Sequence, residues 1–337
     1  MLDVSNAFVN FSNYGGLACS KLGITLDGTD YMLKAPGNLK VKDVKNTKLS
    51  YSNSSVTEYL GSKIYEVFRI PVHEVQLVQY NGKICAMCKD FVKPNKLVEF
   101  RELISTYSVN GTFEIELFGT TTDLEEILDV MHNQHVLQQL PSYEDFFWKM
   151  FVVDALIGNH DRNNGNHGIL QGKYLQIAPV YDNGGCLNPT WDDAKMQECL
   201  KYDSKMLDLA YRVNTCYFTK NNKAINPFQL LASKYYPGLN NALCEVMLTP
   251  FEAIKSVIDN CDILSDIQRE FYTKLLKLRY AKLAEIAKDC YSLTIQRYIE
   301  VYGIDQSRIS DEIHRLMSIT GSKSLKELSE YIQDNFL

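Results

Sequence analysis

Residues 158–170 read GNHDRNNGNHGIL, and residues 175–185 read LQIAPVYDNGG. An apolar helical stretch ends at Gly158, and the polar loop that follows carries an acid, Asp161, and an amide, Asn166. The strand-like LQIAPVY then delivers a second acid, Asp182, directly before an Asn-Gly turn. Two carboxylates and an amide oxygen on loops between short strands are the oxygen ligands that hold magnesium beside the phosphates of a nucleotide.

Upstream of this motif, the sequence places a lysine and a glutamate where they can meet. The run YMLKA, residues 31–35, reads as a strand, so alternation points Lys34 to one face of a sheet. Residues 56–68 have helical spacing, and Glu58 falls in the first turns of that helix. A lysine that holds phosphates and a glutamate that positions it complete the parts that phosphoryl transfer requires.

A glycine pair near the N-terminus supplies a candidate phosphate loop. Gly15 and Gly16 lie between two predicted strands, and Ser20 and Lys21 follow on the return strand. Backbone amides in such a turn can approach a phosphate group. A plain turn is the simpler interpretation of two glycines taken alone.

The pattern along the chain predicts an α+β fold with two lobes. Residues 1–95 read as short strands around the single helix, with a hairpin at Asn81-Gly82. Leu60 and Ile64 share one face of that helix, and the polar run Ser52–Ser55 is suited to cap its start. Residues 96–337 read mainly as helices, including a final amphipathic pair around Gly321. We therefore expect a β-rich N-lobe and a mostly helical C-lobe that carries the polar loops.

Composition narrows the class of protein. The 337 residues carry a net charge of −6, which argues against nucleic acid as the main partner and leaves a local basic patch open. We expect neither a secretory leader nor a membrane span, since no run of 18 apolar residues occurs, and we expect a cytoplasmic protein, with non-classical export or delivery as an effector left open. Nine scattered cysteines do not form a disulfide framework. Cys85 and Cys88 have CxxC spacing but lie in an apolar strand, and His160 and His167 lack further ligands nearby, so we expect no zinc site.

These segments resemble those of a known protein family. DRNNGN followed by PVYDNG is similar to the HipA-like kinases of bacteria, most closely to a compact subgroup of them. The Ser/Asn-rich lead LSYSNSSVTEYL into a helix that bears a glutamate, and the lysine strand YMLKAP, are similar as well. The resemblance extends from about Gly15 to Pro189. It implies a protein kinase that uses ATP and magnesium and acts on Ser or Thr hydroxyls.

The resemblance also implies roles for the motif residues. Asp161 orients or deprotonates the substrate hydroxyl, and Asn166 and Asp182 bind magnesium. Lys34 holds the α- and β-phosphates and is positioned by Glu58.

Further residues are implied to contact the nucleotide. The loop over the phosphates contains Gly15, Gly16, Ser20 and Lys21. The strand from Ala86 to Phe91, with Met87 and Lys89, supplies hinge contacts to adenine. Relatives with modified glycine loops suggest Ser20 as a site of autophosphorylation.

Other functions remain open at this level. The DR-x-x-x-N arrangement also occurs in phosphoinositide kinases, which leaves a lipid or small-molecule kinase as an alternative. Asn163 stands where many such enzymes have a histidine, which weakens that alternative, and the glycine loop lacks a full GxGxxG. A non-catalytic nucleotide-binding pseudokinase is a third possibility.

Arg162 is expected to form a structural salt bridge.

Overall fold

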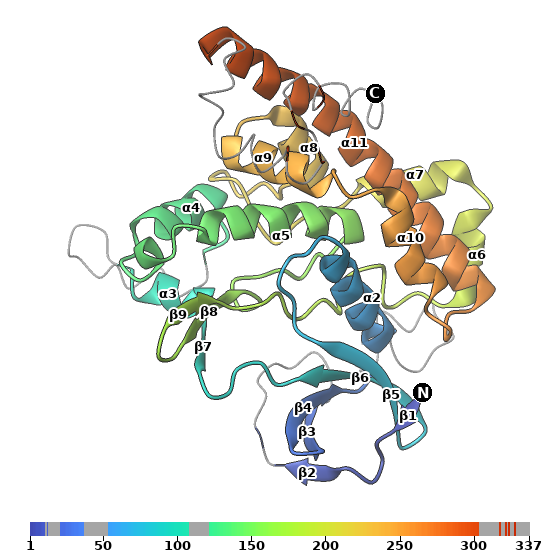
Figure 1. Ribbon diagram of the computed structural model, residues 1–337. Helices are drawn as coiled ribbons and strands as arrows, with labels where there is room; N and C mark the ends of the chain where they lie inside the picture. The colour runs from blue at the N-terminus through green and yellow to red at the C-terminus, as the bar shows by residue number, and fades with distance from the viewer. Residues whose placement is uncertain are drawn as a thin grey trace.

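The computed structural model describes residues 1–10, 12, 21–36, 53–107 and 121–302, with residues 317, 321, 323 and 327. Figure 1 shows a β-sheet at one end of this part of the chain and a larger helical part at the other, with helix α2 (Ser54–Val67) between them. The predicted α+β fold with two lobes is confirmed. The boundary after residue 95 stays a prediction, and the predicted helix pair around Gly321 lies almost wholly outside the described residues.

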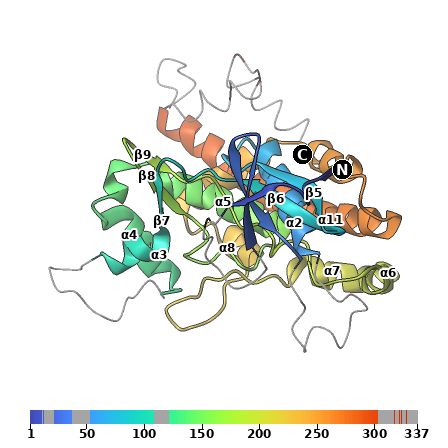
Figure 2. The same ribbon diagram turned by 90° about the horizontal axis from the view of Figure 1, so that it is seen from below.

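The larger sheet has six strands and is strongly curled (Figures 1 and 2). In sheet order its strands are β1 (Leu2–Asp3), β5 (Val75–Tyr80), β6 (Lys83–Lys89), β4 (Thr29–Lys34), β3 (Lys21–Leu26) and β2 (Phe8–Asn10). All neighbours are antiparallel except β1 and β5. The predicted hairpin joins β5 to β6, and its turn residues Asn81 and Gly82 both have positive φ, as a two-residue hairpin turn requires.

Strand alternation separates the two cysteines of the CxxC pair. Cys85 packs with Ile24 and Leu33 on one face of the sheet, whereas Cys88 packs with Val75 and Ala86 on the other. Residues three apart on a strand point to opposite faces. These two thiols therefore cannot bind one metal ion together, in agreement with the sequence prediction.

Helix α2 is buried on both its apolar and its polar side. Leu60 and Ile64 lie in the main hydrophobic core together with the helices of the C-terminal part. The predicted cap differs in detail, because Asn53 occupies the N-cap position without a side-chain bond to the helix. Its Nδ2 donates instead to the carbonyl of Trp191 at 2.9 Å, and its backbone N–H donates to Pro189. The start of α2 is thus tied to the segment that follows the second polar loop.

A small second sheet positions both polar loops of the motif. It consists of β7 (Lys96–Glu99), β8 (Gly168–Gln171) and β9 (Leu175–Ile177), all antiparallel. Residues 158–167 lead into β8, and residues 178–186 follow β9. Pairing between these strands therefore brings the two loops to the same region of the molecule, next to α2 (Figure 1).

Helices make up the rest of the described chain. They are α3 (Phe100–Ser105), α4 (Leu124–Asn133), α5 (Tyr143–Ile157), α6 (Asp193–Leu200), α7 (Asp203–Tyr211), α8 (Pro227–Ser233), α9 (Pro237–Val246), α10 (Phe251–Asp259) and α11 (Asp266–Tyr302), with a 3₁₀ turn at Leu137–Gln139. Helix α5 is apolar on nearly all sides and packs against α8, α9 and α11. A helix of that kind belongs in the core, and α5 is the rigid base from which the first polar loop starts.

The end of α5 is fixed by a glycine and an arginine. Gly158 caps the helix with a φ of +66°, a conformation that favours glycine. A Cβ at this position would lie 2.5 Å from the guanidinium of Arg279. Arg279, in α11, donates to the carbonyls of Leu156 at the end of α5 and Ala210 at the end of α7. The C-terminal helices thus hold the point where the first polar loop begins.

None of the helices in the described ranges has the length and apolar character needed to cross a membrane.

Candidate active site

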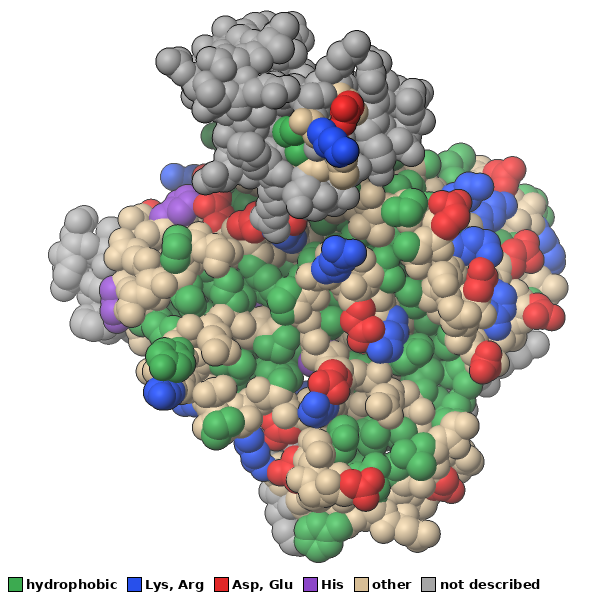
Figure 3. All heavy atoms as spheres, viewed as in Figure 1, with side chains coloured by type: hydrophobic (Ala, Val, Ile, Leu, Met, Phe, Trp, Pro, Cys, Tyr) green, Lys and Arg blue, Asp and Glu red, His purple; other side chains and the backbone are tan. Residues whose placement is uncertain are grey.

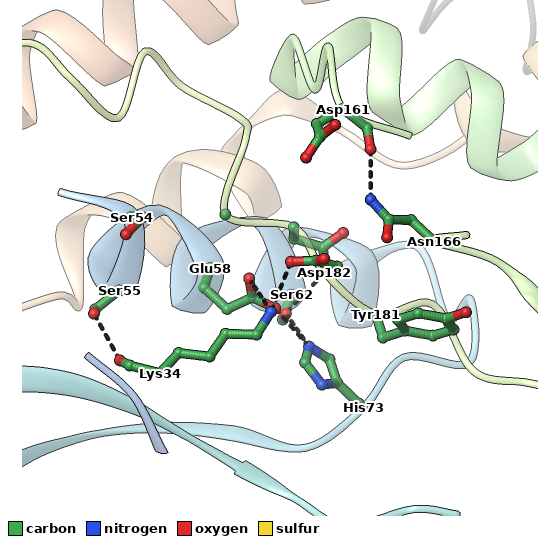
Figure 4. A network of polar contacts seen from close by, with 12 residues as sticks. Lys34, Ser54, Ser55, Glu58, Ser62, His73, Asp161, Asn166, Tyr181 and Asp182 are labelled. Carbon is green, nitrogen blue, oxygen red and sulfur yellow. Dashed lines mark hydrogen bonds and ion pairs between the residues drawn. The ribbon is translucent and has the colours of Figure 1, made fainter. Parts of the chain in front are cut away.

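The predicted lysine and glutamate meet in the interior between the sheet and α2 (Figure 4). Lys34 is the last residue of β4, and its Nζ lies 2.9 Å from Oε2 of Glu58, with both side chains buried. Ser55, also in α2, donates its hydroxyl to the backbone carbonyl of Lys34 at 3.0 Å. Helix α2 therefore holds the lysine through its side chain and through its backbone.

Asp182 lies on the other side of the same ammonium group. Its Oδ1 is 2.8 Å from Lys34 Nζ, and its side chain is 37% exposed. Asp182 has a φ of +59°, which is uncommon for a residue other than glycine. Hydrogen bonds to nearby residues hold this conformation, because Arg162 donates to the carbonyl of Tyr181 and Thr57 donates to that of Gly184. The strained turn directs a partly exposed carboxylate toward the lysine.

The first polar loop presents Asp161 and Asn166 opposite this group (Figure 4). The side chain of Asp161 is exposed, and Asn163 Nδ2 donates to its Oδ1 at 3.1 Å. Asn166 Nδ2 donates to the backbone carbonyl of Asp161 at 2.6 Å. Because a carbonyl can only accept, the amide nitrogen must face it, and Oδ1 of Asn166 remains an acceptor. The loop therefore offers a carboxylate and an amide oxygen.

Arg162 ties the two polar loops together. Its Nε donates to Oδ2 of Asp154 at 2.8 Å, and both side chains are buried. Nη1 donates to the carbonyl of Asn166 at 3.0 Å and to that of Tyr181, and Nη2 donates to Oδ1 of Asn183. The guanidinium thus fixes the backbone of Asn166 and the two neighbours of Asp182. This is the structural role expected for Arg162 from the sequence.

The electrostatics keep the lysine and the glutamate charged. Although burial disfavours the ammonium, Glu58 and then Asp182 hold the pKa of Lys34 well above its usual value. Burial also disfavours the carboxylate of Glu58, yet Lys34 and then His73 lower its pKa far below the usual range. The lysine is therefore positively charged before any ligand binds, and a positive charge is needed to attract an anionic phosphate group.

The remaining predicted nucleotide contacts are placed only in part. Gly15, Gly16 and Ser20 lie outside the described residues, so the phosphate loop stays a prediction. Lys21 begins β3 directly opposite Lys34 in the strand register.

The predicted hinge lies in a strand that is paired on both sides. Met87 and Lys89 are in β6, between β4 and β5, so their backbone groups face neighbouring strands. The side chain of Lys89 forms a surface ion pair with Glu74. Phe91, beyond the strand, packs its ring 5.6 Å from that of Tyr181. Adenine contacts of the hinge stay a prediction, and the structure favours its end near Phe91 over Met87 and Lys89.

Three site residues escaped the sequence analysis. His73 Nε2 lies 3.0 Å from Oε1 of Glu58 and 3.2 Å from the hydroxyl of Ser62. Asn183 Nδ2 donates to the same hydroxyl at 2.9 Å. Asn183 belongs to the PVYDNG segment but was interpreted only as part of a turn, and no periodic or motif signal marks His73 or Ser62, because their partners are distant in the sequence.

Glu58, His73 and Cys88 form a group of possible metal ligands whose donor atoms lie within 4.8 Å of one another. Lys34 already contributes a positive charge to the Glu58 carboxylate in this buried space. A metal ion would have to enter beside that ammonium, which like-charge repulsion opposes. We therefore assign the cluster to the positioning of Glu58 and not to metal binding.

Known proteins share this sequence and this fold. Residues 14–219 match the HipA-like C-terminal domain. The serine/threonine-protein kinase CtkA of Helicobacter pylori is 32% identical over 280 residues, which are 81% of this chain and 83% of that protein. The crystal structure of a Helicobacter pylori proinflammatory kinase CtkA superposes with a TM-score of 0.79 at 30% identity, over 87% of this chain and 98% of that one.

A more distant structure shares the fold alone. A chain of the Shewanella oneidensis toxin–antitoxin complex of HipA, HipB and operator DNA superposes with a TM-score of 0.50 at 13% identity, over 81% of this chain and 65% of that one. Together these matches confirm the resemblance that the DRNNGN and PVYDNG segments predicted.

Proposed function

The chain belongs to the family with the HipA-like C-terminal domain and is similar to the kinase CtkA, and on this premise we propose that it is a protein kinase. In the proposed reaction it transfers the γ-phosphoryl group of ATP to Ser or Thr hydroxyls of proteins, with magnesium. The observation that carries the proposal is the position of Lys34, whose ammonium lies 2.9 Å from Glu58 and 2.8 Å from Asp182. It joins a strand, a helix and a loop that are far apart in the sequence. Such a charged lysine beside an exposed acid is suited to bind metal-bound phosphates.

The residues present fit a magnesium ion. Asn166 keeps Oδ1 as an acceptor because its Nδ2 is bonded to Asp161, and Asp182 offers a partly exposed carboxylate. Oxygen atoms of these two kinds are ligands that magnesium accepts. Asn166 and Asp182 would hold the ion, which when bound would neutralise charge on the phosphates.

In the proposed reaction, Asp161 acts on the acceptor. Its exposed carboxylate receives the proton of the substrate hydroxyl as the oxygen attacks the γ-phosphorus. The bond from that phosphorus to the β–γ bridging oxygen breaks, and ADP leaves. Lys34 stabilises the negative charge on the phosphates, and Glu58 keeps the lysine in place.

Incubation with radiolabelled ATP and magnesium tests the proposal. We expect label in a generic protein substrate, recovered as phosphoserine or phosphothreonine, and a sample without added substrate tests the autophosphorylation that we include in the proposal. Label found only in phosphoinositide vesicles would favour a lipid kinase. No transfer and no thermal shift with ATP and magnesium would favour a non-catalytic protein.

Two variants divide the roles within the site. Asp161→Asn should still shift in melting temperature with ATP and magnesium, while transfer falls by a factor on the order of 10² to 10⁴. Asp182→Ala should lose the thermal shift as well, because a metal ligand is removed. Equal loss of folding in both variants would contradict this division.

A further inference from the structure

We propose that His73 is a positioning residue that holds Glu58 against Lys34 and couples this pair to the loop that carries Asp182. The inference rests on the proposed function, since it concerns how the same site is assembled. His73 lies between α2 and β5, beside Glu58 and Ser62, and its ring lies edge-on to that of Phe91 with the centroids 6.3 Å apart.

The two oxygens of Glu58 have different partners. Oε2 receives the ammonium of Lys34 at 2.9 Å, whereas Oε1 lies 3.0 Å from His73 Nε2. An ionised carboxylate has no hydrogen to donate, so this close contact is favourable only when Nε2 of His73 carries the hydrogen. Both side chains are about 1% exposed, and Oε1 has no hydrogen-bond partner among the described residues, so the close contact with His73 Nε2 is the polar contact that offsets its burial. The imidazole therefore fixes the rotation of the carboxylate that faces the lysine.

The backbone of His73 is fixed to the loop of Asp182. The N–H of His73 donates to the carbonyl of Val180 at 3.0 Å, and the N–H of Val180 donates to that of Pro71 at 2.8 Å. These bonds form a short parallel bridge between Val72 and Val180. Val180 precedes Asp182 by two residues. The imidazole thus sets the position of Glu58 relative to the candidate metal ligand, not only within α2.

A second connection runs through the side chains. Ser62, one turn after Glu58, has its hydroxyl 3.2 Å from His73 Nε2 and accepts from Asn183 Nδ2 at 2.9 Å. Asn183 Oδ1 accepts from Arg162, which also binds the carbonyl of Asn166. Buried polar contacts therefore join the lysine pair to both polar loops. Figure 4 shows His73 beside Glu58 and Ser62.

Replacement of His73 by glutamine or asparagine separates positioning from packing. A glutamine amide can place an N–H near the imidazole Nε2 position, whereas the shorter asparagine cannot reach Glu58. We expect His73→Gln to keep kcat/KM for ATP within a few-fold of the wild type, and His73→Asn to lower it by about tenfold to a hundredfold. Equal losses in the two variants would overturn the proposal.

A double-mutant cycle shows whether His73 acts through Glu58. In a Glu58→Gln background, His73→Asn should cause little further loss, because the group that it positions is already altered. His167→Gln, at a buried histidine that does not contact Glu58, is the matched control and should lower activity by the same factor in both backgrounds. Fully additive losses for His73 would contradict a positioning role.

Two further measurements test the role of His73 even if the proposed kinase activity is wrong. If the wild type transfers no phosphoryl group, the same cycle can be measured on the affinity for ATP by calorimetry, with the same non-additivity expected. The ring ¹⁵N shifts of wild-type His73 need no variant to fold, and they should show a proton on Nε2. A proton on Nδ1 alone would overturn the assignment.

Discussion

Two buried histidines in this chain have different surroundings. His73 faces the carboxylate of Glu58, whereas the ring of His167 stacks 4.7 Å from Phe100 and its Nδ1 is 2.9 Å from the hydroxyl of Tyr143. Among the residues that the structure describes, no acid offsets the burial of His167, and the nearby Arg162 adds positive charge. Burial and then Arg162 lower the pKa of His167 to about 3, so its ring is neutral in the native state.

This difference predicts how stability depends on pH. The unfolded chain takes up a proton at His167 near pH 6.5, whereas the native chain resists it down to about pH 3. The unfolded state therefore binds more protons in this window, and stability falls as the pH falls through it. Between pH 7 and pH 5 the contribution lost is on the order of 2 kcal/mol.

Urea unfolding of the wild type and of His167→Phe, with chelator and without nucleotide, measures this contribution. Phenylalanine keeps an aromatic ring but cannot titrate. We expect the free energy of unfolding of the wild type to fall more steeply between pH 7 and pH 5 than that of the variant. Parallel pH profiles would show that His167 is not buried in its neutral form.

At the residue scale, the sequence indicated the groups that belong to a motif. Lys34, Glu58, Asp161, Asn166 and Asp182 were predicted from residue type and order, and the structure brings them together around one space (Figure 4). Their roles in the reaction stay predictions.

The residues that support these groups could not be predicted. Ser62 and Asn183 are 121 positions apart in the sequence, and only the folded chain shows that they are bonded. A single serine or histidine within a strand or helix has no spacing that would reveal such a partner.

At the scale of elements, α2 shows why a helix can be predicted but its surroundings cannot. Spacing predicted residues 56–68, and the helix extends from Ser54 to Val67. The apolar face was predicted correctly at Leu60 and Ile64. Helical spacing gave no prediction for the other face, where Thr57 and Ser62 are fully buried against the second polar loop and His73. The polar face of α2 is buried by segments that are distant in the sequence, and helical periodicity gives no information about such partners.

Gly61 is the position where α2 approaches that loop most closely. A Cβ there would lie 2.9 Å from Cβ of Asn183 and 3.0 Å from Sγ of Cys186. Alanine would add about 1 kcal/mol of helix propensity, but overpacking a buried contact costs about 1–3 kcal/mol. We expect the cost of overpacking to exceed the gain in helix propensity, because one neighbouring atom is a Cβ whose position is fixed by the backbone.

We therefore expect Gly61→Ala to lower the melting temperature and to reduce phosphoryl transfer per folded molecule. Gly238→Ala in α9 is the matched control, since its Cβ would lie 2.9 Å from Trp148, away from the polar loops. The control should lower the melting temperature while transfer at a permissive temperature is preserved. A Gly61→Ala enzyme with unchanged melting temperature and rate would contradict the close approach.

At the scale of the whole molecule, the site lies where three parts of the chain meet. The six-stranded sheet supplies Lys34, α2 supplies Glu58, and the loops around the small sheet supply Asp161, Asn166 and Asp182. The fold class could be predicted because strand signals dominate residues 1–95 and helix signals dominate the residues that follow. The parallel pairing of β1 with β5 and the pairing of β7 with β8 could not, because they join distant segments without a local signal.

The central claim is that these groups form one nucleotide site with magnesium between the two polar loops. A crystal structure of the wild type with a non-hydrolysable ATP analogue and magnesium tests it most directly. We predict oxygen atoms of Asn166 and Asp182 on the metal, Lys34 Nζ on a phosphate oxygen, and the Asp161 carboxylate facing the γ-phosphate. A nucleotide bound elsewhere, or a metal held without Asn166 and Asp182, would contradict the account.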